Sequence, residues 1–201
     1  MTTLLQYTHD DREEVLGQAQ AALEAGRAII FPSDTVYALL AGSGSAEGYA
    51  EIYAIKRRDP AQPLALLAAP SHPVVNEVMK LLEDFEEEQE AFLCGELTAV
   101  FPRGRLRKIP KETLALQEGS VGIRIPSWEP LCELIERCGG MLWGTSANLS
   151  GSDPQTTSQE MQAALQGMDP APGMCILLSE ELPGKVSDVV RFGPDGPEVI
   201  R

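Results

Sequence analysis

The sequence has few residues that bind metals or form covalent cross-links. It contains two histidines, His9 and His72, among its 201 residues. The four cysteines are Cys94, Cys132, Cys138 and Cys175. No two of them form a C-x-x-C pair, and this spacing argues against a zinc site, which needs closely spaced cysteine and histidine ligands. We expect no metal site and interpret the cysteines as small buried hydrophobic residues.

Long apolar segments are also lacking. No apolar run approaches the roughly 20 residues that a membrane-spanning helix needs. Residues 1–11 show neither the basic region nor the apolar region of a signal peptide. We therefore expect a cytoplasmic protein that does not contact a membrane.

Basic residues are scarce relative to acidic ones. The chain has 16 Lys and Arg against 30 Asp and Glu, which gives a formal net charge of −14. Nucleic-acid binding draws much of its affinity from Lys and Arg that neutralise phosphates. The charge balance therefore argues against direct binding of tRNA.

The common nucleotide-binding motifs are absent. The sequence has no G-x-x-x-x-G-K-[ST] segment, and its Gly-Ser-rich stretch, 42–48, has Glu47 where G-x-G-x-x-G requires a third glycine. This excludes an ordinary P-loop or Rossmann site. We interpret the stretch as a turn that leads into a helix capped by Ser45, with a phosphate cradle as the alternative.

What is present is an alternation of helical and strand patterns joined by short turns, which predicts one α/β domain over residues 1–201. The expected helices cover about 10–25, 45–58, 73–93, 129–137 and 157–166. The expected strands cover 27–31, 64–69, 97–101, 121–125, 141–144, 175–178 and 186–192. A polar loop is expected at 145–157.

Several polar side chains lie where these patterns place a ligand. Lys56 and Arg58, two residues apart at a helix end, can flank one anion; the alternative is a solvated basic helix end. Arg124 lies in a strand that otherwise looks buried, where a guanidinium needs either a ligand anion or an internal ion pair. Ser146 and Asn148 follow a strand end, where α/β sheets commonly bind ligands, although a plain Asn/Ser turn has the same composition.

Four segments together carry more information than any one of them. They are F-P-S-D-T-V-Y-A-L from Phe31, I-K-R-R from Ile55 with Pro63 and Leu64 after it, V-G-I-R-I-P from Val121, and T-S-A-N-L-S-G from Thr145. In this order they resemble the YrdC/TsaC family of L-threonylcarbamoyladenylate synthases, in its short bacterial form, over roughly residues 28–190. Family members typically show P-T-D-T-V-Y-G-L, K-x-R, V-x-R-x-P and S-x-N.

The resemblance implies a twisted mixed sheet flanked by helices, with one concave ligand cleft. It also implies an enzyme that joins ATP, L-threonine and bicarbonate into threonylcarbamoyl-AMP and pyrophosphate, for a separate tRNA-modifying transferase. Mg²⁺ would accompany ATP without a dedicated protein site. The implied ATP-binding residues are Lys56, Arg58, Ser120, Asn148 and Thr156, of which Lys56 and Arg58 would be catalytic. The implied threonine-binding residues are Thr35, Arg124, Ser146 and Ser187.

The chain also departs from the family pattern. Gln62 stands where lysine is common, and C-G-E-L-T from Cys94 replaces P-G-P-x-T, which places Glu96 at a proline position. Losing one cation from an ATP site would cost about 1 to 3 kcal/mol, or roughly ten- to a hundredfold in affinity or rate. Two alternatives follow: an attenuated paralogue that binds a nucleotide or RNA, and a carbamoyl-transfer domain of the hydrogenase-maturation type, whose accompanying acylphosphatase-like and zinc modules are absent.

Overall fold

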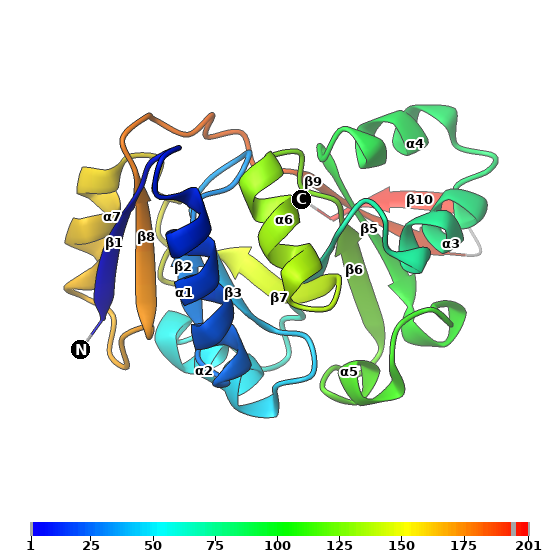
Figure 1. The fold of residues 1–201 in the computed structure, drawn as a ribbon. Coiled ribbons are helices and arrows are strands. Elements are labelled where there is room, and N and C mark those ends of the chain that lie inside the picture. Colours follow the sequence, from blue (N-terminus) through cyan, green and yellow to red (C-terminus); the bar gives the residue numbers. More distant parts are fainter. Residues whose placement is uncertain (1, 194–195, 201) are drawn as a thin grey trace.

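The computed structural model describes residues 2–193 and 196–200. In this part of the chain ten strands form one mixed sheet, in the order β1-β8-β2-β3-β7-β4-β6-β5-β9-β10 (Figure 1). The strands are β1 (Thr3–Tyr7), β2 (Ile29–Phe31), β3 (Ala38–Gly42), β4 (Ala65–Ala68), β5 (Leu97–Pro102), β6 (Ser120–Arg124), β7 (Met141–Ser146), β8 (Met174–Leu178), β9 (Asp188–Gly193) and β10 (Gly196–Val199). The helices are α1 (Arg12–Glu24), α2 (Ala46–Lys56), α3 (Pro73–Leu81), α4 (Glu86–Leu93), α5 (Lys111–Ala115), α6 (Glu129–Arg137) and α7 (Ser158–Leu165), with a 3-10 turn at Arg103–Arg105. The predicted α/β class with a mixed sheet is confirmed.

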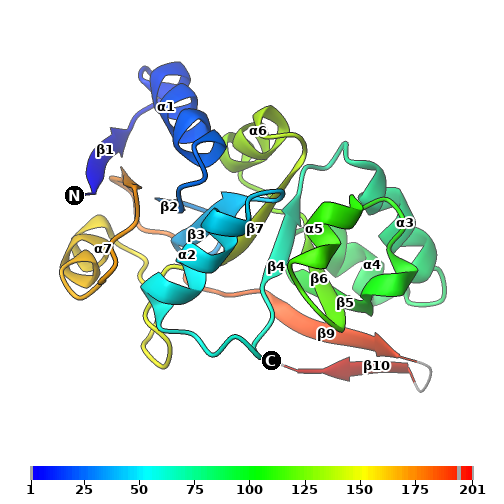
Figure 2. The same cartoon turned by 90° about the horizontal axis from the view of Figure 1, so that it is seen from below.

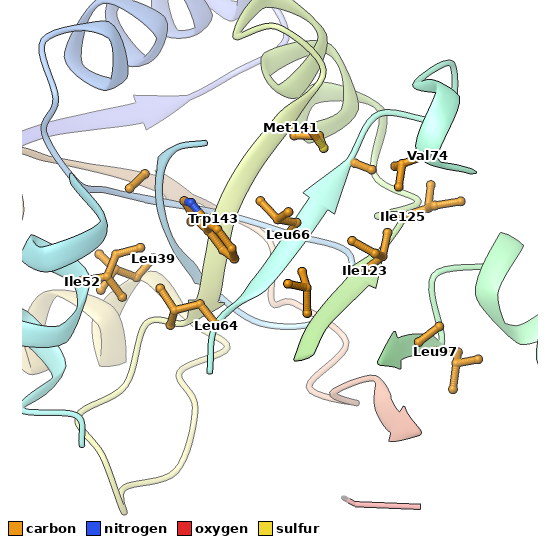
Figure 3. Packing of buried hydrophobic residues seen from close by; sticks show 14 of the residues in the cluster. Leu39, Ile52, Leu64, Leu66, Val74, Leu97, Ile123, Ile125, Met141 and Trp143 are labelled. Carbon is orange, nitrogen blue, oxygen red and sulfur yellow. The ribbon is translucent and has the colours of Figure 1, made fainter. Parts of the chain in front are cut away.

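The main hydrophobic core lies on one face of the sheet. Leu66 pairs with Trp143 on one side and with Ile123 on the other, and all three side chains are fully buried (Figure 3). Because side chains alternate along a strand, these three point to the same face. Helices α2, α3, α4 and α7 cover this face through Ile52, Val74, Phe92 and Met161.

The opposite face carries a second core under α1 and α6. Leu40, Leu67 and Leu142 are the alternate residues of β3, β4 and β7, and they pack in one cluster with Leu16 of α1 and Leu131 of α6. Figure 2 shows α1 and α6 together on one side of the sheet and α2 on the other. Helix α1 contacts mainly β1, β2, β3 and β8, and α6 contacts mainly β4 and β7. The main contacts of both helices therefore lie away from β5, β6 and β9, and this leaves part of that face without a helix.

Local sequence signals set both ends of α2 and the start of α7. The Ser45 hydroxyl accepts a hydrogen bond from the Gly48 amide at 3.0 Å and begins α2 after a turn at 42–45, as predicted. Arg57 ends α2 in the left-handed conformation. Thr157 and Glu160 form a reciprocal capping box at the start of α7.

The structure corrects several predictions. The single helix expected at 73–93 is two helices, because the chain turns at 83–85 and the Gln89 side chain donates to the Leu82 carbonyl at 2.7 Å, where α3 ends. The turn lets Phe85 pack against Phe192, with ring centroids 5.5 Å apart. Strands β1, β3 and β10 and helix α5 lie outside the predicted elements. Of the four cysteines, Cys175 is buried as expected but Cys94 is exposed.

Among residues 2–193 and 196–200, no helix has the length and apolar character needed to cross a bilayer.

Candidate active site

A cavity of about 520 Å³ opens on the face of the sheet that α1 and α6 leave uncovered. Small residues on three adjacent strands form its floor, since Ala65 of β4 pairs with Gly122 of β6 and with Gly144 of β7. A Cβ atom on Gly122 would lie 2.9 Å from the Thr98 side chain, and one on Gly144 would lie 3.1 Å from Leu67. The two glycines therefore create the depth of the cavity.

The charge of the cavity is opposite to that of the whole chain. In the described part of the chain, its lining includes Arg58, Arg124 and Arg191 and no Asp or Glu, although the sequence has 30 acidic residues against 16 basic ones. A cleft lined by one sign of charge attracts ligands of the other sign. The cavity is therefore suited to an anionic ligand.

Arg124 is held in a fixed position at the end of β6. Its Nη2 donates to Asp34 Oδ2 at 2.8 Å and its Nε donates to the Gly95 carbonyl at 3.0 Å. Asp34 Oδ2 also accepts from the Ser127 amide at 3.1 Å. Within the described residues, Arg124 Nη1 makes no hydrogen bond, and the side chain lines the cavity. The structure shows the internal ion pair, which is one of the two predicted alternatives; binding of a ligand anion by Arg124 stays a prediction.

The peptide carbonyl that fixes Arg124 belongs to a glycine that cannot be replaced easily. Gly95 has a φ of +80°, and a Cβ atom there would lie 2.9 Å from both Asp34 Oδ2 and the Ile125 carbonyl oxygen. Glycine adopts this left-handed conformation without a steric penalty. Gly95, which the C-G-E-L-T segment shares with the family pattern P-G-P-x-T, therefore allows the Arg124–Asp34 contact, because a larger residue would clash with the Asp34 carboxylate.

Hydroxyl groups line the same cavity as Arg124. Thr98 Oγ1 and Ser187 Oγ lie 2.9 Å apart, and Ser33 Oγ and Thr35 Oγ1 lie 3.0 Å apart. Ser146 lines the cavity from the end of β7. The structure therefore brings together all four residues that were predicted to bind threonine, and it adds Ser33 and Thr98.

Lys56 does not line the cavity but holds one of its walls. Lys56 is 2% exposed. Its ammonium group donates to the carbonyls of Ser146 and Asn148, each at 2.5 Å, and to Asn148 Oδ1 at 3.2 Å. A buried ammonium needs such acceptors. In the structure the Lys56 ammonium contacts the Ser146–Asn148 segment, and the pairing of Lys56 with Arg58 around one anion stays a prediction.

The residues predicted to bind ATP divide into two groups. Arg58, Ser120 and Gln62 line the cavity, and Arg58 donates to the carbonyls of Gln62 and Pro63 at 3.2 and 3.1 Å. Asn148 and Thr156 are not among the lining residues. The Asn148 amide group donates to the Ser152 carbonyl at 2.5 Å, and Thr156 Oγ1 contacts Glu160 at 3.3 Å.

Glu96, which stands at a proline position of the family pattern, lies outside the cavity. Its carboxylate lies 3.6 Å from the Lys185 ammonium, its side chain is 60% exposed, and it is not a lining residue of the cavity. By contrast, sequence reasoning missed Arg191, which lines the cavity from β9. The signal in the sequence was that Arg191 stands between the apolar residues Val190 and Phe192 in an expected strand, so its side chain points to the face opposite theirs.

The chain matches the family model Sua5_yciO_yrdC, described as telomere recombination, over residues 21–201. It is 33% identical to the threonylcarbamoyl-AMP synthase of Mus musculus over 155 residues, which is 74% of this chain and 51% of the relative. It is 26% identical to that of Bacillus subtilis over 90% of this chain and 47% of the relative. It is 30% identical to that of Blochmanniella pennsylvanica over 84% of this chain and 86% of the relative. The chain thus spans about half the length of the mouse and B. subtilis proteins.

Two solved structures have the same fold. The P. abyssi Sua5 complex with L-threonine superposes with a TM-score of 0.78 at 23% identity, over 100% of this chain and 57% of that one. E. coli YciO superposes with a TM-score of 0.74 at 20% identity, over 100% of this chain and 94% of that one. The fold predicted from the four sequence segments is confirmed, and the chain belongs to the Sua5/YciO/YrdC family.

Proposed function

We propose that residues 1–201 form one catalytic domain that makes threonylcarbamoyl-AMP and pyrophosphate from ATP, L-threonine and bicarbonate. The observation that carries this proposal is a cavity with three arginines and no acidic side chain among its described lining residues, in an acidic chain. Two of the substrates are anions and the third carries a carboxylate. The relatives from mouse, B. subtilis and B. pennsylvanica bear the name of this synthase, and P. abyssi Sua5 was solved with L-threonine.

The threonine end of the cavity is proposed to be the part around Arg124. Its Nη1 edge can donate to the threonine carboxylate, because Asp34 and Gly95 already orient the guanidinium. The hydroxyl groups of Thr35, Ser146 and Ser187 can donate to or accept from the amine and hydroxyl of threonine. These four residues all line the cavity.

The ATP end is proposed to be the part around Arg58 and Ser120, which lie beside Gln62. Lys56 is proposed as a positioning residue that keeps the Ser146–Asn148 segment in place. Asn148 and Thr156 are assigned to ATP only through the family resemblance. No acidic side chain lines the described part of the cavity, so we propose that Mg²⁺ arrives bound to the phosphates of ATP.

The proposed reaction has two steps. Bicarbonate takes up a proton and loses water to give CO₂, and the neutral amine of threonine adds to CO₂ and releases a proton, so the net products are the carbamate and one water. A carbamate oxygen then attacks the α-phosphorus while the bond from the α-phosphorus to the pyrophosphate oxygen breaks, and pyrophosphate leaves. Negative charge builds on the phosphates, and a fixed guanidinium such as that of Arg58 stabilises it. The protein thus contributes binding, orientation and cations, and the reaction requires no nucleophilic side chain.

The product would pass to a separate tRNA-modifying transferase in the cytoplasm. With a net charge of −14, the chain is not expected to bind tRNA itself. A filter-binding titration of tRNA at several salt concentrations tests this, and tight binding with a steep salt dependence would contradict it.

Pyrophosphate release tests the proposed reaction. Purified protein supplied with ATP, Mg²⁺ and bicarbonate should release pyrophosphate when L-threonine is added and not without it. The absence of any threonine-dependent release would refute the activity.

Gln62 supports one alternative, an attenuated paralogue that binds a nucleotide or RNA. Gln62 lines the cavity where the family commonly has lysine, so the ATP end has one cation fewer than the family pattern. The alternative predicts ATP binding without turnover. A gain of turnover in Gln62→Lys would show that the remaining site is competent and that this one position limits it.

A further inference from the structure

The third arginine of the cavity, Arg191, has no role in the site described so far. It lies on β9, and its direction is set by the strand. Val190 and Phe192, the residues on either side of it, are 6% and 3% exposed and pack in the main core. Because side chains alternate along a strand, Arg191 must point to the opposite face, where it lines the cavity together with Val189.

Arg191 and Arg58 approach the cavity from opposite sides. Arg191 of β9 pairs with Val100 of the neighbouring strand β5. Val100 pairs with Gly122 of β6, and Gly122 pairs with Ala65 of β4. Arg58 is anchored by the carbonyls just before β4. Three strand intervals of about 4.8 Å therefore separate the two sides, roughly 14 Å. The floor between them is Val100, Gly122 and Ala65, so valine is the largest side chain at these three positions.

The present partner of Arg191 is one that a ligand can displace. Arg191 Nη1 lies 3.0 Å from Glu198 Oε2 of β10, in a cross-strand pair whose side chains are 51% and 67% exposed. Exposed ion pairs of this kind contribute little to stability. A ligand with several negative charges can compete with a single exposed carboxylate, since phosphate oxygens match the guanidinium fork.

We propose that Arg191 is a phosphate-binding residue that faces Arg58 across the floor of the cavity and contacts the polyphosphate of a nucleoside triphosphate. The ligand class rests on the proposed function, but the placement of the arginine does not. Glu198 would hold the guanidinium when no ligand is bound and give it up to the phosphates. Strand β9 thus supplies the cation that completes the ATP end on the side away from α2 (Figure 2).

The test compares three ligands by calorimetry: ATP, AMP and inorganic tripolyphosphate. Arg191→Gln should weaken ATP and tripolyphosphate binding about tenfold or more, because one charge-assisted contact is lost. AMP binding should change less than twofold, since AMP lacks the outer phosphates. Arg191→Lys keeps the charge but loses the planar fork, so it should fall between wild type and Arg191→Gln.

The chain offers a matched control in Arg27. Its side chain is 52% exposed and forms a 3.0 Å ion pair with Glu51, but it does not line the cavity. Arg27→Gln removes the same charge and should leave all three affinities within twofold of wild type. An equal loss of ATP affinity in Arg27→Gln and Arg191→Gln would show a general charge effect and overturn the proposal, as would an unchanged ATP affinity in Arg191→Gln.

The outcome separates this inference from the proposed function. If tripolyphosphate binding depends on Arg191 but wild-type protein releases no pyrophosphate with threonine, the phosphate site stands and the synthase reaction fails. If release is normal and Arg191→Gln keeps its ATP affinity, the reaction stands and this inference fails. Wild-type protein that binds neither ATP nor tripolyphosphate would refute both.

Discussion

Replacing Lys56 by methionine tests whether its ammonium group holds the loop after β7. Lys56→Met keeps an unbranched side chain that is one heavy atom shorter, and it removes all three donors. The carbonyls of Ser146 and Asn148 and the side-chain oxygen of Asn148 then lose their hydrogen-bond donor. Lys56 is only 2% exposed, so water does not easily replace that donor. Each buried acceptor left unpaired costs about 1 to 3 kcal/mol, and part of this loss is offset because the variant no longer buries an ammonium group, which gives about 3 to 5 kcal/mol in total.

Lys56→Met should therefore lower the free energy of unfolding by about 3 to 5 kcal/mol, measured by urea denaturation followed by circular dichroism. For a chain of this size, the melting temperature should fall by roughly 10 °C. Arg58→Met is the matched comparison, because Arg58 donates to two exposed carbonyls, and the substitution should cost under about 1 kcal/mol. If Lys56→Met keeps wild-type stability and only loses ATP affinity, the ammonium contacts ligand and the positioning role is wrong.

Three further predictions concern the cavity and the thiols. Gly122→Ala places a Cβ atom 2.9 Å from the Thr98 side chain, so it should cost about 1 to 3 kcal/mol in unfolding free energy and weaken threonine binding measured by calorimetry; unchanged binding would show that the floor is not part of the site. Arg124→Met leaves Asp34 without its cation and should abolish detectable threonine binding while ATP binding stays within a few fold of wild type; equal losses for both ligands would contradict the assignment of the two ends. In a thiol titration with an aromatic disulfide at pH 8, Cys94 should react first because it is exposed. Burial raises the pKa of Cys132 and Cys138 to about 11 and that of Cys175 to about 12, so these thiols stay protonated and should react slowly. Fast reaction of Cys175 would contradict its burial.

Hydrophobic runs bounded by turn residues predicted most of the central strands. The runs at 64–69, 97–101 and 121–125 became β4, β5 and β6, because these strands are buried and their apolar residues continue on both faces. Strand β3 begins at Ala38, inside the P-S-D-T-V-Y-A-L segment, which was interpreted as a binding motif and not as a strand. Strands β1 and β10 lie at the two edges of the sheet, where exposed residues leave little periodicity.

The residues of the candidate site also divide into those that could be predicted from the sequence and those that could not. The need of Arg124 for a partner was predictable, because a guanidinium in a buried strand requires one, and the structure shows the predicted internal ion pair. Lys56 was not predictable in its present role, since a helix-end lysine gives no sign that the loop ninety residues later supplies its acceptors. Arg191 was also missed, because only the pairing of β9 with β5 brings it beside the cavity.

The most direct test of the proposed synthase is detection of its product. Wild-type protein is incubated with ATP, Mg²⁺, L-threonine and ¹³C-bicarbonate, and the mixture is analysed by mass spectrometry. The account predicts threonylcarbamoyl-AMP that carries the ¹³C label and is formed with an equal amount of pyrophosphate. ATP that remains intact under these conditions, or pyrophosphate released without a labelled adenylate, would contradict it.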